Sequence, residues 1–276
     1  MPHHAARPIA SDEFFTCRHP EDYHPDWKGF YEAALARRDE VRALIPHADE
    51  KYGPDPSHLA NVYFPEKAQG SPVIVYFHGG RWREGHPAFY DHLALPWVRA
   101  GAVFISCGYR LEPRHTIADA VHDAALAVTW SQDVAARYGG DPERVVVAGH
   151  SAGGHLAAMV TMTDWPTAPK VPVAGVVCMS TPADLGPDAA GMSPARRVTR
   201  CPQRVVISYG VPEPNKKGQD GNFFADQGRS LAKAVEDAGS SPVVVEMQDT
   251  DHVASATAFA EPGSSLFAAA ESTVFA

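Results

Sequence analysis

The residues best suited to do chemistry lie in the segment 145–156, which reads as a buried strand, a Gly-x-Ser-x-Gly turn and the start of a helix. Ser151 stands at the centre of the turn. A serine at such a sharp strand-to-helix turn projects its hydroxyl outward, and small neighbours let the backbone turn that tightly. The amide of Ala152 begins the helix and can donate to a developing oxyanion. The segment can also be a glycine-rich turn with an idle serine, but its flanking strand and helix favour Ser151 as the nucleophile of a serine hydrolase.

A nucleophilic serine needs a base, and the order of strands and helices restricts where that base can lie. In sheets with this arrangement the acid and then the histidine follow the serine along the chain. His252 is the only histidine after His155, and it follows the last predicted strand by a few residues. We therefore predict His252 as the general base, against the alternative of a histidine on a surface loop.

The acid that orients the base should follow the predicted strand over 204–209. Glu213 is the first carboxylate after that strand, and Asp220 and Asp226 remain open as alternatives. Asp251 is a poorer candidate, because its position next to the histidine in sequence is awkward for a bond to the imidazole Nδ1. We predict Glu213 as the acid.

A second glycine-containing loop, 77–82, directly follows the predicted strand over 73–77. Glycines let backbone amides approach a substrate carbonyl closely, so the N–H of Gly79 or Gly80 is the expected second oxyanion donor beside that of Ala152. We expect Trp82 to line the pocket, Arg81 to meet a substrate carboxylate or solvent, and His78 to shape the loop by hydrogen bonding. The candidate substrate-binding residues are His78, Arg81, Trp82 and His150, of which His150 can equally be a packing residue.

The elements that must position these residues alternate along the chain. Strands are predicted over 59–64 (an edge strand), 73–77, 102–107, 144–148, 173–179, 204–209 and 243–247. Helices are predicted over 30–44, over 117–135 between a Thr116 cap and the glycines 139–140, and over 231–238. Short apolar runs separated by amphipathic helices indicate an α/β fold with a mostly parallel central sheet covered on both faces. We expect one domain without a large separate lid, with 1–44 as an arm and helix near the site and 45–276 as the catalytic part.

Bulk properties exclude several classes of function. The chain has 276 residues, of which 45% are hydrophobic, enough for a sizeable core. Its net charge of -9 argues against a nucleic-acid partner, since phosphate binding needs clustered cations. The four cysteines are far apart and predict neither a disulfide framework nor a zinc site, with Cys107 and Cys178 expected to be buried.

The N-terminal residues lack the apolar core of a signal peptide, and no apolar run approaches the roughly 20 residues that span a bilayer. We therefore expect a soluble, cytoplasmic protein that does not act at a membrane. A homodimer remains open.

These motifs together resemble the α/β-hydrolase superfamily over about residues 45–276. The segment 78–82 is similar to the His-Gly-Gly-x-Trp motif of the kynurenine formamidases (arylformamidases) and related bacterial esterases. The segment 210–213 ends in Glu213 where that family keeps its acid, and the segment 180–187 and the Gln227–Ser230 pair have counterparts in it. The resemblance implies a cofactor-free hydrolase of small N-formyl amides or esters.

A second group, the hormone-sensitive-lipase-like esterases, is similar over 109–113 and 139–142. That group usually carries a third glycine where Arg81 stands and has a different acid motif. The chain also departs from the formamidases, which usually have Asp at position 213 and lack most of the segment 214–226. A carboxylesterase acting on short acyl or aryl esters is therefore the alternative function. A third possibility, a non-enzymatic binding module on the same fold, would be expected to have a broken triad.

Overall fold

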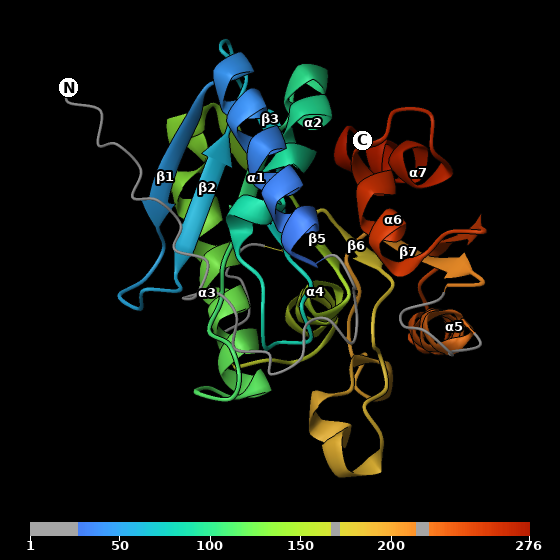
Figure 1. The fold of residues 1–276 in the computed structure, drawn as a ribbon. Helices are drawn as coiled ribbons and strands as arrows, with labels where there is room; N and C mark the ends of the chain where they lie inside the picture. The colour runs from blue at the N-terminus through green and yellow to red at the C-terminus, as the bar shows by residue number, and fades with distance from the viewer. Residues whose placement is uncertain (1–26, 167–171, 214–220) are drawn as a thin grey trace.

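A mixed eight-stranded sheet runs through the centre of the part of the chain that the computed structural model describes, residues 27–166, 172–213 and 221–276 (Figure 1). Its strand order is β1-β2-β4-β3-β5-β6-β7-β8. The pairs β1–β2 and β2–β4 are antiparallel, and the remaining pairs are parallel. The strands are β1 (His47–Lys51), β2 (Leu59–Tyr63), β3 (Ser71–Phe77), β4 (Val103–Cys107), β5 (Gly140–His150), β6 (Gly175–Met179), β7 (Arg204–Val211) and β8 (Val243–Gln248).

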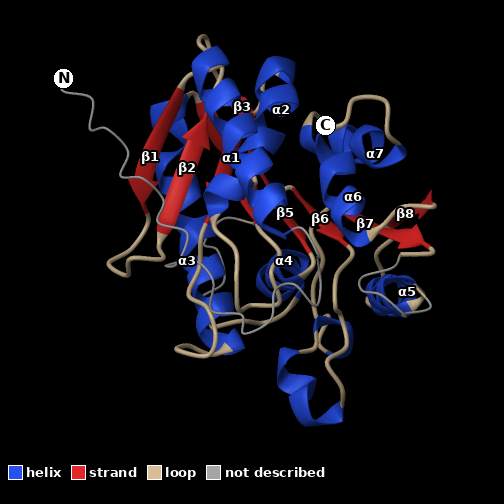
Figure 2. Ribbon diagram, viewed as in Figure 1, coloured by secondary structure: helices blue, strands red, loops and turns tan. Residues whose placement is uncertain are grey.

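Helices cover both faces of this sheet (Figure 2). Side chains of α3 (Ile117–Val134), α4 (Ala152–Met162) and α5 (Phe223–Asp237) form one core with Val73, Val75 and Phe77 of β3. Side chains of α1 (Trp27–Leu44), α2 (Ala94–Ala100) and α7 (Ser265–Val274) form the other with Ile74 and Tyr76. The alternation along β3 follows from the two-residue period of a strand, and burial on both faces explains its continuous apolar sequence.

The predicted α/β architecture is confirmed, and one assignment within it is wrong. The segment 59–64 is not an edge strand, because β2 pairs with β1 on one side and with β4 on the other. The edge is β1, whose sequence His-Ala-Asp-Glu-Lys carries no apolar pattern and leaves alternate residues exposed. Charged residues are common on edge strands because they discourage pairing with other chains. Because of these charges the segment has no apolar pattern, so it was not predicted as a strand.

Local signals in the sequence located the ends of α3 correctly. Thr116 caps the helix in a capping box with Asp119, each side chain accepting a hydrogen bond from the other residue's backbone N–H. A short 3-10 turn follows the helix, and Gly139 then takes the left-handed conformation that stops it. The helix predicted over 231–238 is longer and begins at Phe223, while α2, α7 and the short α6 (His252–Thr257) were not predicted.

Parallel strands bring their carboxyl ends to one edge of the sheet, so the loops after β3, β5, β6, β7 and β8 gather there. These loops carry every predicted catalytic residue. Cys107 and Cys178 are buried as predicted. Across the described ranges, none of the helices combines the length and apolar character needed to cross a membrane.

Candidate active site

Ser151 occupies the sharp turn between β5 and α4. Its φ of 54° and ψ of -120° lie in a strained region for a residue other than glycine. The turn is held by hydrogen bonds from Ser151 N–H to the Met179 carbonyl (2.8 Å) and from His155 N–H to the Ser151 carbonyl (3.0 Å). A Cβ on Gly153 would collide with the Phe77 carbonyl, so only glycine fits there. This is the geometry in which a serine hydroxyl is held out from the end of a sheet.

The loop after β3 lies directly against the turn that carries Ser151. A Cβ built on Gly79 would come within 3.3 Å of the Ser151 Cβ and 3.2 Å of the His150 carbonyl. The first N–H groups of a helix have no partner within the helix, and Ala152 is the first residue of α4. The structure therefore places the backbone of Gly79 beside Ser151 and Ala152, and the role of the Gly79, Gly80 and Ala152 amides as oxyanion donors stays a prediction.

His78 supports this loop from within the core. Its side chain lies between the rings of Tyr109 (4.4 Å between centroids, stacked) and Tyr90 (5.9 Å). His78 Nδ1 lies 2.7 Å from the Gly79 carbonyl, to which it donates, and Tyr109 donates its hydroxyl to the His78 carbonyl (2.8 Å). Burial lowers the pKa of His78 to about 4, so the ring is neutral at pH 7. His78 therefore holds the loop by hydrogen bonds from the core side, as predicted. Direct contact between this buried ring and a substrate stays a prediction.

Trp82 and Arg81 follow the glycines and both have positive φ angles, 59° and 55°. Trp82 packs edge-on against the ring of His155 (4.9 Å between centroids). His155 Nε2 in turn donates to the Met192 carbonyl (2.6 Å), which ties the loop to the segment after β6. Arg81 forms an ion pair with Glu84 (3.0 Å). Trp82, a predicted binding residue, is therefore half-buried against α4. The positive charge of Arg81, another predicted binding residue, is paired with Glu84.

Glu213 and His252, the predicted acid and base, are in direct contact. His252 Nδ1 lies 2.6 Å from Glu213 Oε1, and the carboxylate is fully buried whereas the imidazole is 15% exposed. The Gly210 N–H donates to the other carboxylate oxygen, Oε2 (2.6 Å). The ring of Phe224 stacks on the imidazole at 4.1 Å. Because an ionised carboxylate only accepts hydrogen bonds, Nδ1 carries the proton and Nε2 is left to act as a base.

The other candidate acids are placed differently. Asp226 lies in the first turn of α5 with a side chain that is 72% exposed, and it faces Arg229. Asp251 caps α6 by accepting from the N–H groups of Val253 and Ala254. Asp220 lies outside the described residues. Of the described candidates, Glu213 is the one that contacts His252.

Three further polar residues adjoin this pair: His150, which the sequence offered as a substrate-binding or packing residue, and Ser180 and Ser255, which were not assigned from the sequence. His150 is buried with its ring 4.5 Å from that of His252, and its Nε2 lies 3.1 Å from Ser255 Oγ. Ser180 Oγ contacts both Glu213 Oε2 (2.9 Å) and Ser255 Oγ (2.8 Å). Ser180 is the first residue after β6, and Ser255 lies one helical turn after the base. Those positions are the signals by which a sequence could have suggested them.

Gln227 joins α5 to the segment after β6. Its Oε1 accepts from the backbone N–H groups of Ala183 (2.8 Å) and Asp184 (2.6 Å). This glutamine was noticed in the sequence only through a family resemblance. In the structure it fixes the segment that carries Ser180 against the helix that carries Phe224.

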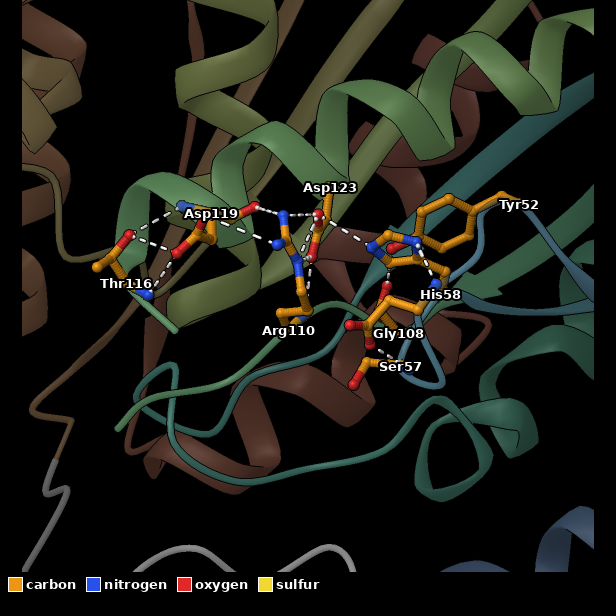
Figure 3. A network of polar contacts seen from close by, with 9 residues as sticks. Tyr52, Ser57, His58, Gly108, Arg110, Thr116, Asp119 and Asp123 are labelled. Atoms are coloured by element: carbon orange, nitrogen blue, oxygen red, sulfur yellow. Dashed lines mark hydrogen bonds and ion pairs between the residues drawn. The ribbon is translucent and has the colours of Figure 1, made fainter. Parts of the chain in front are cut away.

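A second buried network lies beside β2 and α3 (Figure 3). Asp123 contacts His58 Nε2 (3.0 Å) and accepts from the guanidinium and the backbone N–H of Arg110. Tyr52 donates its hydroxyl to the Gly108 carbonyl (2.6 Å). The network anchors the segment after β4, which carries Tyr109, the donor to the His78 carbonyl, so it indirectly supports the loop 77–82.

Comparisons with known proteins agree with this architecture. Residues 74–207 match the model of a family described by the α/β-hydrolase fold. The chain is 41% identical over 101 residues to the carboxylesterase NlhH of Mycobacterium tuberculosis, which covers 36% of this chain and 32% of that protein. The matched part thus spans about a third of that relative's length. The chain is also 28% identical over 221 residues to the kynurenine formamidase of Danio rerio, with 74% of this chain and 73% of that protein covered.

One solved structure extends the likeness to nearly the whole chain. A putative thioesterase from Silicibacter sp. superposes with a TM-score of 0.74 at 23% identity, covering 90% of this chain and 95% of that one. At this identity the likeness is one of fold.

Proposed function

The chain has the α/β-hydrolase fold, and from this premise we propose that it is a serine hydrolase that cleaves a small N-formyl amide through an acyl-enzyme. Ser151 is the nucleophile, His252 the general base and Glu213 the acid that orients it. The amides of Ala152 and of Gly79 or Gly80 form the oxyanion hole. No step of this mechanism requires a metal or an organic cofactor.

One observation carries the proposal: the 2.6 Å contact between His252 Nδ1 and Glu213 Oε1, at the sheet edge where Ser151 occupies a strained turn. The contact fixes the imidazole tautomer, so that Nε2 is available to the serine hydroxyl. The strained turn supports the nucleophile role, since such strain is concentrated at functional sites. The proposal rests on the two features together, because each also occurs singly elsewhere: Ser180 has a φ of 46°, and His58 contacts the buried carboxylate of Asp123.

The chemistry follows from these positions. Ser151 Oγ attacks the formyl carbon while His252 Nε2 takes the hydroxyl proton, and the carbonyl oxygen gains the charge that the backbone amides stabilise. Glu213 stabilises the imidazolium that forms. The imidazolium then gives its proton to the departing amine, and the C–N bond breaks to leave a formyl ester on Ser151. Water activated by the same imidazole hydrolyses that ester and releases formate.

Two features support an N-formyl amide as the substrate class. The loop 78–82 carries the His-Gly-Gly-x-Trp pattern of formamidases, and Trp82 packs against His155 of the helix that follows Ser151, which places an aromatic ring near the proposed nucleophile. The kynurenine formamidase relative also aligns over about three quarters of both chains. The ion pair between Arg81 and Glu84 argues against a dedicated clamp for a charged amino-acid substrate at that position.

The alternative is a carboxylesterase that acts on short acyl or aryl esters. It is favoured by the higher identity, 41% over 101 residues, to the mycobacterial carboxylesterase. The same three residues would carry that reaction, because an ester differs from an amide only in its leaving group. The choice therefore depends on substrate preference.

The deciding experiment compares hydrolysis of an N-formyl aryl amine and a short aryl ester by the same preparation, with Ser151→Ala as the blank. A kcat/KM at least tenfold higher for the formamide supports the formamidase function. A preference for the ester moves the protein to the carboxylesterases and leaves the triad in place. Hydrolysis that survives in Ser151→Ala, or hydrolysis of neither substrate by the unmodified protein, would overturn the proposal.

A further inference from the structure

The Glu213 carboxylate is held on two sides. Oε1 faces His252, while Oε2 accepts from the Gly210 N–H and contacts Ser180 Oγ at 2.9 Å. Ser180 Oγ continues to Ser255 Oγ (2.8 Å), and Ser255 Oγ continues to His150 Nε2 (3.1 Å). A continuous line of polar atoms therefore joins the acid to His150, the residue before the nucleophile.

The number of available protons limits the direction in which hydrogen bonds can run along this line. The Ser180 hydroxyl has one proton, and a charged carboxylate is a stronger acceptor than a neutral hydroxyl, so Ser180 donates to Glu213. The contact between the two serines then requires that Ser255 donate to Ser180. Ser255 Oγ also lies 2.9 Å from the His252 carbonyl, an acceptor that competes for the same proton, and we assign that proton to Ser180 because the contact between the two serines is the shorter, at 2.8 Å. The remaining contact requires that His150 donate from Nε2 to Ser255.

The state of His150 is consistent with this order. The ring is buried, and burial together with the neighbouring His252 holds the pKa of His150 well below its usual value, so it carries one proton. The buried Nδ1 has no hydrogen-bond partner within the described structure. A neutral imidazole with its proton on Nε2 needs a donor only at Nδ1, and leaving an acceptor unfilled costs less than leaving a buried N–H unfilled.

The backbone at Ser180 supplies an independent observation. Its φ of 46° lies in the left-handed region that favours glycine, and the residue is fully buried. The conformation is held by the Ser180 N–H, which donates to the Ser208 carbonyl (2.7 Å). A side chain in this strained position places its hydroxyl at the carboxylate, which a glycine could not do.

We propose that His150, Ser255 and Ser180 form a one-directional donor chain that positions the catalytic carboxylate relative to the nucleophile turn. The inference rests on the proposed serine-hydrolase mechanism. All three are positioning residues, since they act through Glu213. His150 is joined by a peptide bond to Ser151, so the chain ties the acid to the same backbone as the nucleophile. The donor chain keeps Glu213 Oε1 directed at His252 while the imidazolium forms. A carboxylate rotated away from the ring would stabilise the imidazolium less.

The principal test is Ser180→Gly. Glycine suits the positive φ of this residue, so the variant removes the hydroxyl without forcing the backbone to move. We expect kcat to fall by about 10- to 100-fold at unchanged KM, because the loss affects alignment of the acid rather than binding. The thermal unfolding midpoint is measured on the same sample, and it should not fall. A kcat within about twofold of the unmodified protein overturns the proposal.

A double-mutant cycle tests whether Ser180 acts through the carboxylate. In a Glu213→Gln background the hydroxyl has no charged acceptor to position, so adding Ser180→Gly should change kcat by less than about twofold. A purely structural role predicts the same fold-loss in both backgrounds. Ser131→Ala is the matched control, since it removes an equally buried hydroxyl that bonds only within α3 (Ser131 Oγ to the Ala127 carbonyl, 2.7 Å). Its kcat should stay within about twofold of the unmodified protein.

The far end of the chain has its own test. His150→Gln places an amide N–H near the position of Nε2 and should keep most of the activity, whereas His150→Leu should lower kcat by about tenfold. Nitrogen-15 chemical shifts of the His150 ring should show the neutral form protonated at Nε2. Protonation at Nδ1 would contradict the direction of the chain.

Failure of this inference can be told apart from failure of the proposed function. If the unmodified protein hydrolyses its substrate and Ser151→Ala does not, the mechanism stands. Full activity of Ser180→Gly in the same assay would then contradict the donor-chain proposal and leave the hydrolase mechanism in place. If the unmodified protein is inactive on both substrate classes, the proposed function fails first.

Discussion

Among the residues that the structure describes, two histidine–carboxylate pairs have a buried carboxylate, and they differ in what else holds that carboxylate. His252 Nδ1 lies 2.6 Å from Glu213, and His58 Nε2 lies 3.0 Å from Asp123. Both carboxylates are fully buried. Taken alone, either pair could orient a general base.

The difference lies on the far side of each carboxylate. Asp123 also accepts hydrogen bonds from two guanidinium nitrogens and from the backbone N–H of Arg110, so the Arg110 cation already balances its charge. Glu213 accepts instead from the Gly210 amide and the Ser180 hydroxyl, both neutral donors. The negative charge of a carboxylate held by neutral donors is not balanced, so it can stabilise an imidazolium that forms during a reaction. The charge of a carboxylate paired with arginine is already balanced, so it stabilises an imidazolium less.

The surroundings of the two imidazoles agree with this division. His252 is partly exposed at the sheet edge that carries Ser151, while His58 stacks on Tyr52 inside the network of Figure 3. The first pair suits catalysis, and the second fastens β2 and the segment after β4 to α3. A histidine beside a carboxylate therefore indicates an active site only together with a nucleophile and a carboxylate whose charge is otherwise unmet.

The largest expected effect separates the two histidines. His252→Gln should lower kcat by about 10⁴- to 10⁶-fold, because it removes the base that activates Ser151. His58→Gln should change kcat by less than about tenfold, since Gln keeps a donor toward Asp123. Initial rates on the preferred substrate give both numbers. Comparable losses in the two variants would break the comparison.

The second prediction concerns the acid. Glu213→Gln should lower kcat by about 10²- to 10⁴-fold while leaving stability little changed, because the amide cannot stabilise the imidazolium. Asp226→Asn serves as the matched control, since that exposed carboxylate lies on the same stretch of chain. If Glu213→Gln stays near full activity and Asp220→Asn does not, the role of the acid passes to Asp220.

The third prediction concerns stability at the other pair. Asp123→Asn should lower the free energy of unfolding by about 3 to 5 kcal/mol, because Arg110 loses its buried counter-charge. Urea denaturation followed by circular dichroism measures this change. At a temperature where the variant is folded, its kcat should fall far less than that of Glu213→Gln. An Asp123→Asn protein as stable as the unmodified one would show that this network does not stabilise the fold.

The smallest expected effect comes from a buried histidine that lacks a carboxylate. Burial lowers the pKa of His155 to about 4, against an ordinary value of 6.5. The unfolded chain therefore binds a proton between these pH values and the folded chain does not, so stability is full above pH 6.5 and falls as the pH drops toward 4. His155→Gln cannot titrate and keeps a donor for the Met192 carbonyl. It should lessen the pH slope of unfolding free energy by up to about 1.4 kcal/mol per pH unit, and an unchanged slope would contradict the assignment.

The sequence was most informative where chemistry leaves a local pattern. The turn around Ser151 and the chain order of acid and base were enough to single out Glu213 and His252, which the structure places in contact. The strands of the central sheet were found because burial on both faces makes them continuously apolar. The motif in segment 78–82 likewise drew attention to Gly79, whose backbone lies beside Ser151.

The parts that were missed depend on which side chains meet across the fold. Ser180 and Ser255 are common residue types, and their contact follows from how β6 and α6 pack at the sheet edge. Phe224 was not identified because nothing in the sequence shows that α5 presents it to His252. The edge strand β1 escaped because its charges suit solvent rather than a core.

Covalent labelling tests the central claim most directly. The protein would be treated with a fluorophosphonate, and the modified peptide would be identified by mass spectrometry alongside Ser151→Ala, His252→Gln and His58→Gln. The account predicts one adduct, on Ser151, that is absent in Ser151→Ala, slowed by about 100-fold or more in His252→Gln and nearly unchanged in His58→Gln. No adduct, an adduct on another serine, or equal slowing in the two histidine variants would contradict it.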